Sequence, residues 1–226
     1  MFTVLRTLST VHFFYMDPSI FLPAIVIVIL SIIFHEVAHG YVADLLGDPT
    51  ARYAGRLTLN PISHIDPIGS IAIPGILALT HSPFLIGWAK PVPYNPYNLK
   101  NQRWGEALVS AAGPLTNILL AVLFGLSIRF FGNALPEQVT AVLIIATLAN
   151  LSLAILNMIP IPPLDGSKVL RSLLPYELAL SYSRLEAMTY ALGPFGLIGV
   201  LLLFVYVFSS PVFTFVYFLF SLIVGG

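Results

Sequence analysis

The chain has 226 residues, of which 58% are hydrophobic and only 9% are charged, and its mean hydropathy is +0.92. A soluble domain carries about 25% charged residues, so this composition excludes an ordinary soluble protein and indicates a polytopic membrane protein. The formal net charge is zero, which provides no field to attract nucleic acid, and there is no cysteine for a disulfide or a thiolate metal site.

The N-terminal stretch, Met1–Asp17, contains one Arg and scattered aromatic residues. It lacks the ordered charged, apolar and small-residue regions of a signal peptide, so we expect a short interfacial segment and no cleavable signal. The first membrane span follows, from about Phe21 to Leu46. Pro23 stands near its start, where a missing N–H does no harm to a helix.

Residues 35–39 of this span read H-E-x-x-H. On a helix, His35 and His39 share one face, so their imidazoles can hold one zinc ion, and Glu36 can reach a water on that ion. Ionisable side chains in a bilayer are functional candidates by default, because burying them without a partner is costly. From Phe21 to His35 the helix rises about 21 Å against a hydrocarbon core of about 30 Å, so the histidines lie in the far third of the membrane, close to water.

Polar and apolar stretches alternate before the next clear span. Residues 47–67 are polar, and the strand-like composition of Tyr53–Leu59 favours a small sheet. Residues 68–88 are apolar but interrupted by glycine and proline, and residues 87–98 contain too much proline for a helix. His64 and Asp66 either pair beside the site or form a polar turn, and we favour the turn.

Three clearer spans follow, at Glu106–Phe131, Val139–Met158 and Met188–Phe208, and Pro211–Val224 is a further candidate that is only just long enough. The connection 159–177 is rich in proline and then predicts a short amphipathic helix. We therefore expect an all-α polytopic membrane protein with about five to six transmembrane helices. It would form a single domain over residues 1–226, with a core at about 19–175 and C-terminal helices at about 186–226.

Lys and Arg gather before the second clear span and after the third, and the positive-inside rule makes both connections cytoplasmic. This topology places the histidines near the cytoplasm and requires an even number of crossings between His39 and Glu106. Residues 68–88 then form a re-entrant or β-hairpin segment, or they cross and residues 89–104 cross back. We favour the hairpin, since non-helical backbone is tolerated at membrane depth where it lines a cavity.

A catalytic zinc site needs a third protein ligand beside the two histidines. Asp165 lies in a Leu-Asp-Gly turn just past the third span, on the same side of the membrane as the histidines, and is the strongest candidate. Asp66 and Glu106 are also on that side, but their positions as a loop acid and a helix N-terminal carboxylate explain them adequately.

Two further features stand in the second span. Asn117, on an otherwise apolar helix, either lines the site or makes a helix–helix hydrogen bond. Gly113 and Pro114 allow close packing or a kink.

Three motifs, in this order, resemble those of the site-2 protease family of intramembrane zinc metalloproteases, peptidase family M50. They are H-E-x-x-H at residues 35–39, A-G-P-x-x-N at 112–117 and N-x-x-P-x-P-x-L-D-G at 157–166. The stretches GRLTLNPISHIDPIG and GWAKPVPYNP are similar to the compact subgroup that lacks PDZ and CBS domains. The resemblance covers about residues 31–175 and departs from the Asp-Gly-Gly of many members, because Ser167 follows Gly166.

The resemblance implies that His35, His39 and Asp165 are the ligands of one Zn²⁺ per chain and that Glu36 is the catalytic base. It also implies that Asn157, and with it Asn117, positions the substrate. The implied reaction is hydrolysis of peptide bonds in or near transmembrane segments, in regulated intramembrane proteolysis.

The expected partners are a membrane-protein substrate and the lipid bilayer, without nucleic acid, and a regulatory membrane partner or a homo-oligomer is a further candidate. The expected location is the plasma membrane of a prokaryote, with the active site toward the cytoplasm. A membrane zinc transporter or metal-handling protein is the alternative function. A single His-Glu-His cluster disfavours it, because a transport path needs further polar residues. A non-catalytic scaffold is disfavoured because all four chemical groups are present.

Overall fold

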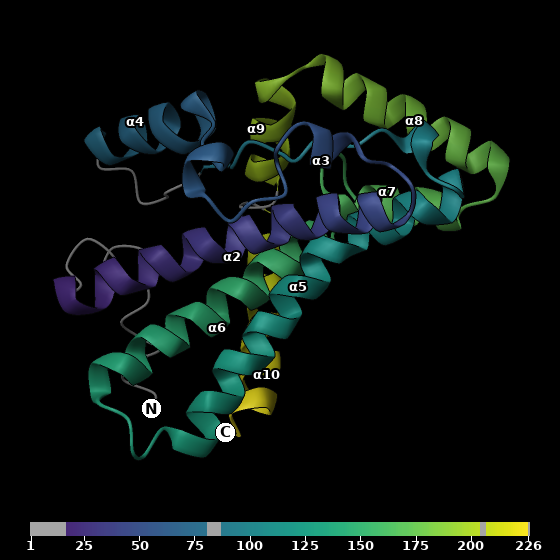
Figure 1. Ribbon diagram of the computed structural model, residues 1–226. Coiled ribbons are helices and arrows are strands. Elements are labelled where there is room, and N and C mark those ends of the chain that lie inside the picture. Colours follow the sequence, from purple (N-terminus) through teal and green to yellow (C-terminus); the bar gives the residue numbers. More distant parts are fainter. Residues whose placement is uncertain (1–16, 81–86, 204–206, 226) are drawn as a thin grey trace.

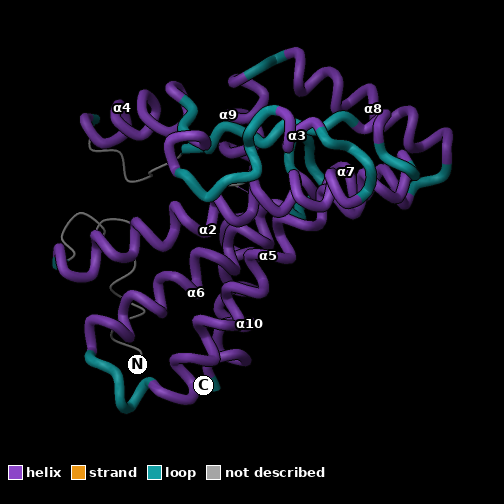
Figure 2. The backbone as a smooth tube through the Cα atoms, in the orientation of Figure 1, coloured by secondary structure: helices purple, strands orange, loops and turns teal. Residues whose placement is uncertain are grey.

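Three long helices that cross one another organise the computed structural model, which describes residues 17–80, 87–203 and 207–225 (Figure 1). They are α2 (Pro18–Leu45), α5 (Gln102–Phe131) and α6 (Glu137–Asn157), and each is long and apolar enough to cross a membrane. In the described ranges the chain forms helices and loops without a strand, as Figure 2 shows. The expected all-α membrane architecture is therefore confirmed.

Local sequence signals set both ends of α2. The Asp17 side chain accepts a hydrogen bond from the backbone N–H of Ser19 at 2.8 Å, and Pro18 occupies the first helical position. Just beyond Leu45, Gly47 has a φ of 109°, a conformation that glycine adopts without strain. The predicted first span is thus confirmed as a helix, whereas the predicted interfacial segment lies, apart from Asp17, outside the described residues.

A small apolar core joins α5 and α6 to the C-terminal helix α10 (Ser209–Val224), which is 16 residues long. Its fully buried members are Ala121, Leu151, Val216 and Phe220. The predicted fifth candidate span at Pro211–Val224 is therefore a helix packed against the two central ones, although it is shorter than a full membrane crossing.

The end of α3, a turn and a loop replace the sheet that the sequence predicts at Tyr53–Leu59, so that prediction is wrong. The reason is local: the N–H of Arg56 donates to the carbonyl of Ala51, and Gly55, with a φ of 63°, ends the helical turn. The elements between α2 and α5 are α3 (Thr50–Tyr53), a 3₁₀ turn at Pro61–His64, a π-helical turn at Pro67–Ala72, α4 (Ile73–Leu79) and a 3₁₀ turn at Pro96–Asn98. Of residues 87–98, which were predicted not to be helical, 87–95 lie outside any helix and Pro96–Asn98 form the 3₁₀ turn.

The C-terminal half contains α7 (Asp165–Leu173), α8 (Tyr176–Ala191) and α9 (Pro194–Leu203). The predicted amphipathic helix after the third span is α7. The prediction of one continuous span at Met188–Phe208 is wrong, because the helix breaks between Ala191 and Pro194. Gly193 has a φ of 55° there, and Pro194 has no N–H with which to continue the helix.

The smaller helices α3, α4, α7 and α8 gather on one side of α2, and the connection between α5 and α6 lies at the opposite end of the molecule (Figure 1). The C-terminal half of α2 contacts both α5 and α3, and α5 contacts α7. This arrangement brings the start of α7 to the helix that carries the H-E-x-x-H residues.

Candidate metal centre

Three side chains from two distant parts of the chain meet at one point. The Nε2 atoms of His35 and His39 are 3.1 Å apart, and the carboxylate oxygen Oδ2 of Asp165 lies 3.2 Å from the first and 3.3 Å from the second. Both histidines are buried, with 6% and 8% of their surfaces exposed. The helix α2 places the histidines one turn apart, and the first residue of α7 supplies the carboxylate.

The other ring nitrogen of each histidine is held by a buried oxygen. Nδ1 of His35 donates to the side-chain oxygen of Asn117 at 2.6 Å, and Nδ1 of His39 donates to the backbone carbonyl of Val109 at 2.7 Å. Because both protons are on Nδ1, both Nε2 atoms present lone pairs to each other and to Asp165. Metal-binding histidines are oriented in this way.

This donor set fits zinc. Three lone-pair atoms that face one another without a proton between them repel, and a divalent cation removes that repulsion. Tetrahedral ligands at about 2.0–2.2 Å from zinc are about 3.3–3.6 Å apart, close to the spacings of 3.1–3.3 Å found among these three atoms. Among the described residues, His35, His39 and Asp165 form the one group of His and acidic side chains that could hold a metal ion.

A glycine lets α5 pass directly over the histidines. A Cβ atom at Gly113 would lie 2.5 Å from Nε2 of His39 and 2.6 Å from Nε2 of His35. Any larger residue would displace the imidazoles, so Gly113 serves close packing, one of the two roles predicted for it.

Asn117 belongs to a buried polar network that joins all three central helices. Its Nδ2 donates to the side-chain oxygen of Asn150 on α6 at 2.9 Å, and Asn150 in turn donates to the hydroxyl of Ser31 on α2 at 2.9 Å. The sequence reasoning missed Asn150 and Ser31, although a polar residue in an apolar helix is a usable signal. It also missed Val109, which acts only through its backbone carbonyl and leaves no signal in the sequence.

The remaining candidate residues lie elsewhere. Asp66 accepts from the N–H groups of Ile68 and Gly69 at the start of a helical turn, and Glu106 pairs with Arg171. His64 bonds the carbonyl of Thr58. The favoured polar-turn interpretation therefore agrees with the contacts of His64 and Asp66, and neither Asp66 nor Glu106 joins the histidines.

Glu36 and Asn157 make hydrogen bonds outside the cluster of His35, His39 and Asp165. Oε2 of Glu36 accepts a hydrogen bond from the backbone N–H of Val92 at 3.0 Å. Asn157 is the last residue of α6, and its Nδ2 donates to the carbonyl of Leu153 at 2.9 Å.

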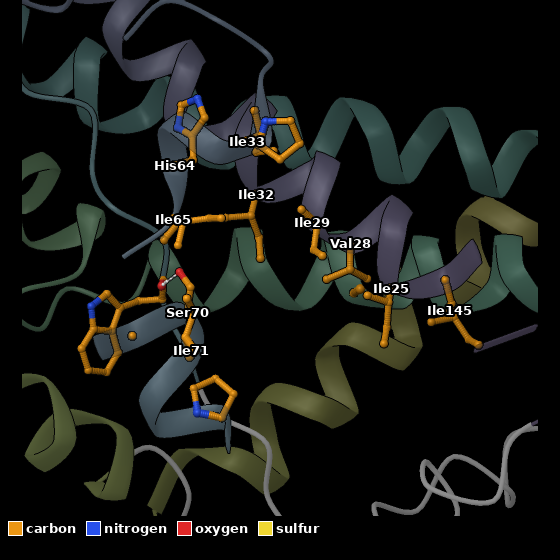
Figure 3. A pocket seen from close by; sticks show the side chains of 18 residues that line it. Ile25, Val28, Ile29, Ile32, Ile33, His64, Ile65, Ser70, Ile71 and Ile145 are labelled. Atoms are coloured by element: carbon orange, nitrogen blue, oxygen red, sulfur yellow. Dashed lines mark hydrogen bonds between the residues drawn. The ribbon is translucent and has the colours of Figure 1, made fainter. Parts of the chain in front are cut away.

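An apolar cavity of about 720 Å³ lies along the part of α2 that precedes His35 (Figure 3). Its wall on α2 is aliphatic and includes Ile25, Val28, Ile29 and Ile32. The opposite wall comes from residues within 61–74 and from residues 87–89, and Ile145 of α6 closes one end. On α2 the cavity thus extends from Ala24 to Ile33 and ends before His35.

Comparison with known proteins agrees with this chemistry. The sequence model described as "Peptidase family M50" matches residues 126–200. A protein of Bacillus subtilis (strain 168) named "Putative zinc metalloprotease YwhC" is 35% identical over 204 residues, which are 86% of this chain and 85% of that protein. The chain belongs to peptidase family M50. It is accordingly a zinc metalloprotease with membrane helices, and Zn²⁺ is the metal that the family uses.

More distant relatives carry similar names. Proteins named "Putative zinc metalloprotease Rip2" from Mycolicibacterium smegmatis and Mycobacterium tuberculosis are 32% and 30% identical to this M50 chain. Each match covers 61% of this chain and 52% of the relative. No solved structure matches the chain significantly.

Proposed function

We propose that this M50 metalloprotease hydrolyses peptide bonds in or beside transmembrane segments of other membrane proteins, as in regulated intramembrane proteolysis. One observation carries the proposal: His35 and His39 are buried in a helix long and apolar enough to cross a membrane, and Asp165 meets them there. A protease with ligands at that depth acts on peptide that is itself in or near the bilayer.

His35, His39 and Asp165 would hold the zinc ion, and Glu36 would act as the general base. When bound, zinc supplies a water of lowered pKa and polarises the carbonyl of the scissile peptide. Glu36 takes the proton of the attacking water and returns it to the leaving amine. We also propose that Asn157 positions the substrate, whereas the contacts of Asn117 support a role in orienting His35.

The apolar cavity supports a substrate of matching chemistry. Its aliphatic wall on α2 would accept the apolar side chains of a membrane-spanning segment. A polar peptide would not match this wall. Because a membrane helix keeps its carbonyls in internal hydrogen bonds, the substrate must unwind locally before attack.

The proposal includes a topology. Residues 1–226 would form one domain with about five to six crossings, and residues 68–88 would re-enter the membrane without crossing it. The metal centre would face the cytoplasm of a prokaryotic cell. A membrane partner or a second copy of the chain would regulate access.

Replacement of the general base tests the function. Purified wild type and Glu36→Gln are reconstituted in liposomes with a single-span reporter protein, and cleavage products and bound zinc are measured. We expect cleavage by wild type alone, with about one zinc per chain in both proteins, because the glutamine cannot take a proton but leaves the three ligands intact. Cleavage by Glu36→Gln would refute the mechanism, and zinc flux without cleavage would favour the transporter.

A further inference from the structure

The proposed base Glu36 is bound by a residue far from it in the sequence. The N–H of Val92 donates to Oε2 of Glu36 at 3.0 Å, across 56 residues of chain. Val92 stands between Pro91 and Pro93, neither of which has an N–H. The contact is therefore made by the one amide that this Pro-Val-Pro segment possesses.

The side chain of Val92 packs against the face of α2 that carries Glu36. Gly40 follows Glu36 by one helical turn, and a Cβ atom at Gly40 would lie 2.7 Å from Cγ1 of Val92. Val92 is 5% exposed. Its amide and its side chain thus contact two positions of one helix, which fixes how the segment approaches Glu36.

Neighbouring amides hold the segment on both sides of Val92. The N–H of Lys90 donates to the carbonyl of His64 at 2.9 Å, and the N–H of Trp88 donates to the carbonyl of Gly69 at 3.2 Å. Beyond Val92, the N–H of Asn95 donates to the buried carboxylate of Asp48. The segment 88–95 is anchored at each of these points, and its contact with Glu36 is one member of the series.

We propose that the Val92 amide is a positioning group for Glu36 in the proposed proteolytic reaction, on which this inference rests. A glutamate side chain is flexible, and one oxygen held by a fixed N–H restricts the carboxylate to one orientation. The other oxygen is then left to take the proton of the attacking water. Small displacements of a catalytic group lower the rate strongly, so this contact should act on turnover.

Amide exchange tests the contact without reference to activity. Hydrogen–deuterium exchange of residues 88–95 is compared in wild type and Glu36→Ala. The Val92 amide should exchange about tenfold or more faster in Glu36→Ala, because it loses a hydrogen bond to a charged acceptor. The Lys90 amide should stay protected in both proteins, because it donates to the carbonyl of His64. Equal exchange of Val92 in both proteins would overturn the proposal.

Proline variants test the role. Val92→Pro removes the N–H, Val92→Ala retains it and shortens the side chain, and Lys90→Pro removes a neighbouring N–H instead. We expect Val92→Pro to lower kcat about 10–100-fold at little change in KM and with zinc still bound, and the other two variants to lose far less.

The outcomes separate the two proposals. If wild type cleaves the reporter and Glu36→Gln does not, the proposed function stands. Equal losses in Val92→Pro and Lys90→Pro would then assign the effect to placement of the segment and overturn the positioning role alone. Faster turnover in Val92→Pro would also overturn it, by making the contact inhibitory.

Discussion

At the residue scale, the chemistry of this centre depends on which nitrogen of each histidine carries the proton. His35 and His39 each direct Nδ1 at a buried oxygen, one from Asn117 and one from the backbone at Val109. A backbone carbonyl cannot be removed by substitution, whereas the Asn117 amide can. Asn117 therefore offers the direct test of how much orientation contributes to metal binding.

Asn117→Ala should weaken zinc binding by about 10–100-fold, because His35 loses the acceptor that fixes its ring. Competition with a chelator of known affinity measures this change. Asn117→Asp retains an oxygen acceptor and should recover most of the affinity.

Thr116→Val is the matched control for this series. The Thr116 hydroxyl bonds only within its own helix, to the carbonyl of Ala112 at 2.9 Å. Its replacement should leave zinc affinity within about threefold of wild type. Equal affinities in Asn117→Ala and Thr116→Val would contradict a role for Asn117 in orienting His35.

At the element scale, the position of Asp165 depends on how α7 is attached. Arg171 of α7 pairs with Glu106 of α5 and with Glu186 of α8, and Glu186 also accepts from the hydroxyl of Ser167 at 3.1 Å. Burial opposes the charge of Arg171, but the two carboxylates raise its pKa above the usual value. One cation thus ties α5, α7 and α8 together six residues after Asp165, the proposed metal ligand.

Arg171→Ala should destabilise the protein by about 3 kcal/mol, since it leaves two largely buried carboxylates without a counter-ion. It should also weaken zinc binding, because α7 carries Asp165. Thermal unfolding in detergent and zinc titration measure the two effects.

The ion pair of Arg52 with Asp44 supplies the control for that prediction. The Arg52 side chain is 61% exposed and that of Asp44 is 11% exposed, so Arg52→Ala leaves one largely buried carboxylate where Arg171→Ala leaves two. It should destabilise the protein less than Arg171→Ala and leave zinc binding unchanged. Similar behaviour of the two variants would show that Arg171 does not hold α7 in place.

A second attachment joins the loop after α2 to the segment that ends at Asn98. The buried carboxylate of Asp48 accepts from the side chains of Thr50 and Asn98 and from the N–H of Asn95. Burial alone would raise the pKa of Asp48, but these hydrogen bonds lower it below its ordinary value of 3.8. Because the pKa of Asp48 is lower in the folded state, its charge stabilises the protein at pH values above the ordinary pKa of 3.8. This stabilisation is lost as the pH falls from 3.8 through the lower pKa of the folded state.

Asp48→Asn should therefore lower the melting temperature by a constant amount between about pH 5 and pH 7, and this difference from wild type should shrink as the pH falls below 3.8. Melting curves of both proteins across this range measure the effect. A difference that does not change with pH would show that the charge of Asp48 contributes nothing.

At the scale of the whole molecule, the arrangement of the helices predicts which loops share one side of the membrane. The helices α3, α7 and α8 gather at the end of α2 that carries the histidines, and the α5–α6 connection lies at the other end (Figure 1). If α5 spans the membrane, as its length and composition allow, we expect these two groups of loops to face opposite compartments.

Single cysteines can test this topology directly, because the chain contains none. A cysteine at the exposed position Tyr53 should react with a membrane-impermeant thiol reagent only from the cytoplasmic side, and one at Asn133 only from the opposite side. Labelling of intact cells and inverted vesicles measures this. Reversed labelling would place the metal centre away from the cytoplasm.

The sequence by itself determined what depends on local spacing and hydropathy. The apolar runs predicted α2, α5 and α6, because a spanning helix needs about 20 apolar residues. The four-residue interval of His35 and His39 predicted a shared helical face, which the structure shows as adjacent Nε2 atoms. Where the sequence prediction was wrong, at Met188–Phe208, the helix breaks at the pair Gly193-Pro194, which is itself a local signal of a helix end.

Only the tertiary structure decided how distant groups meet at the centre. The side of the membrane alone could not distinguish Asp165 from Asp66 or Glu106, and the resemblance of N-x-x-P-x-P-x-L-D-G at residues 157–166 is what favoured Asp165 in the sequence. The packing of α5 against α2 and α7 brings Asp165 to the histidines and pairs Glu106 with Arg171. The carbonyl of Val109 and the amide of Val92 contact His39 and Glu36 through the backbone, which every residue shares, so no side-chain pattern could have indicated them.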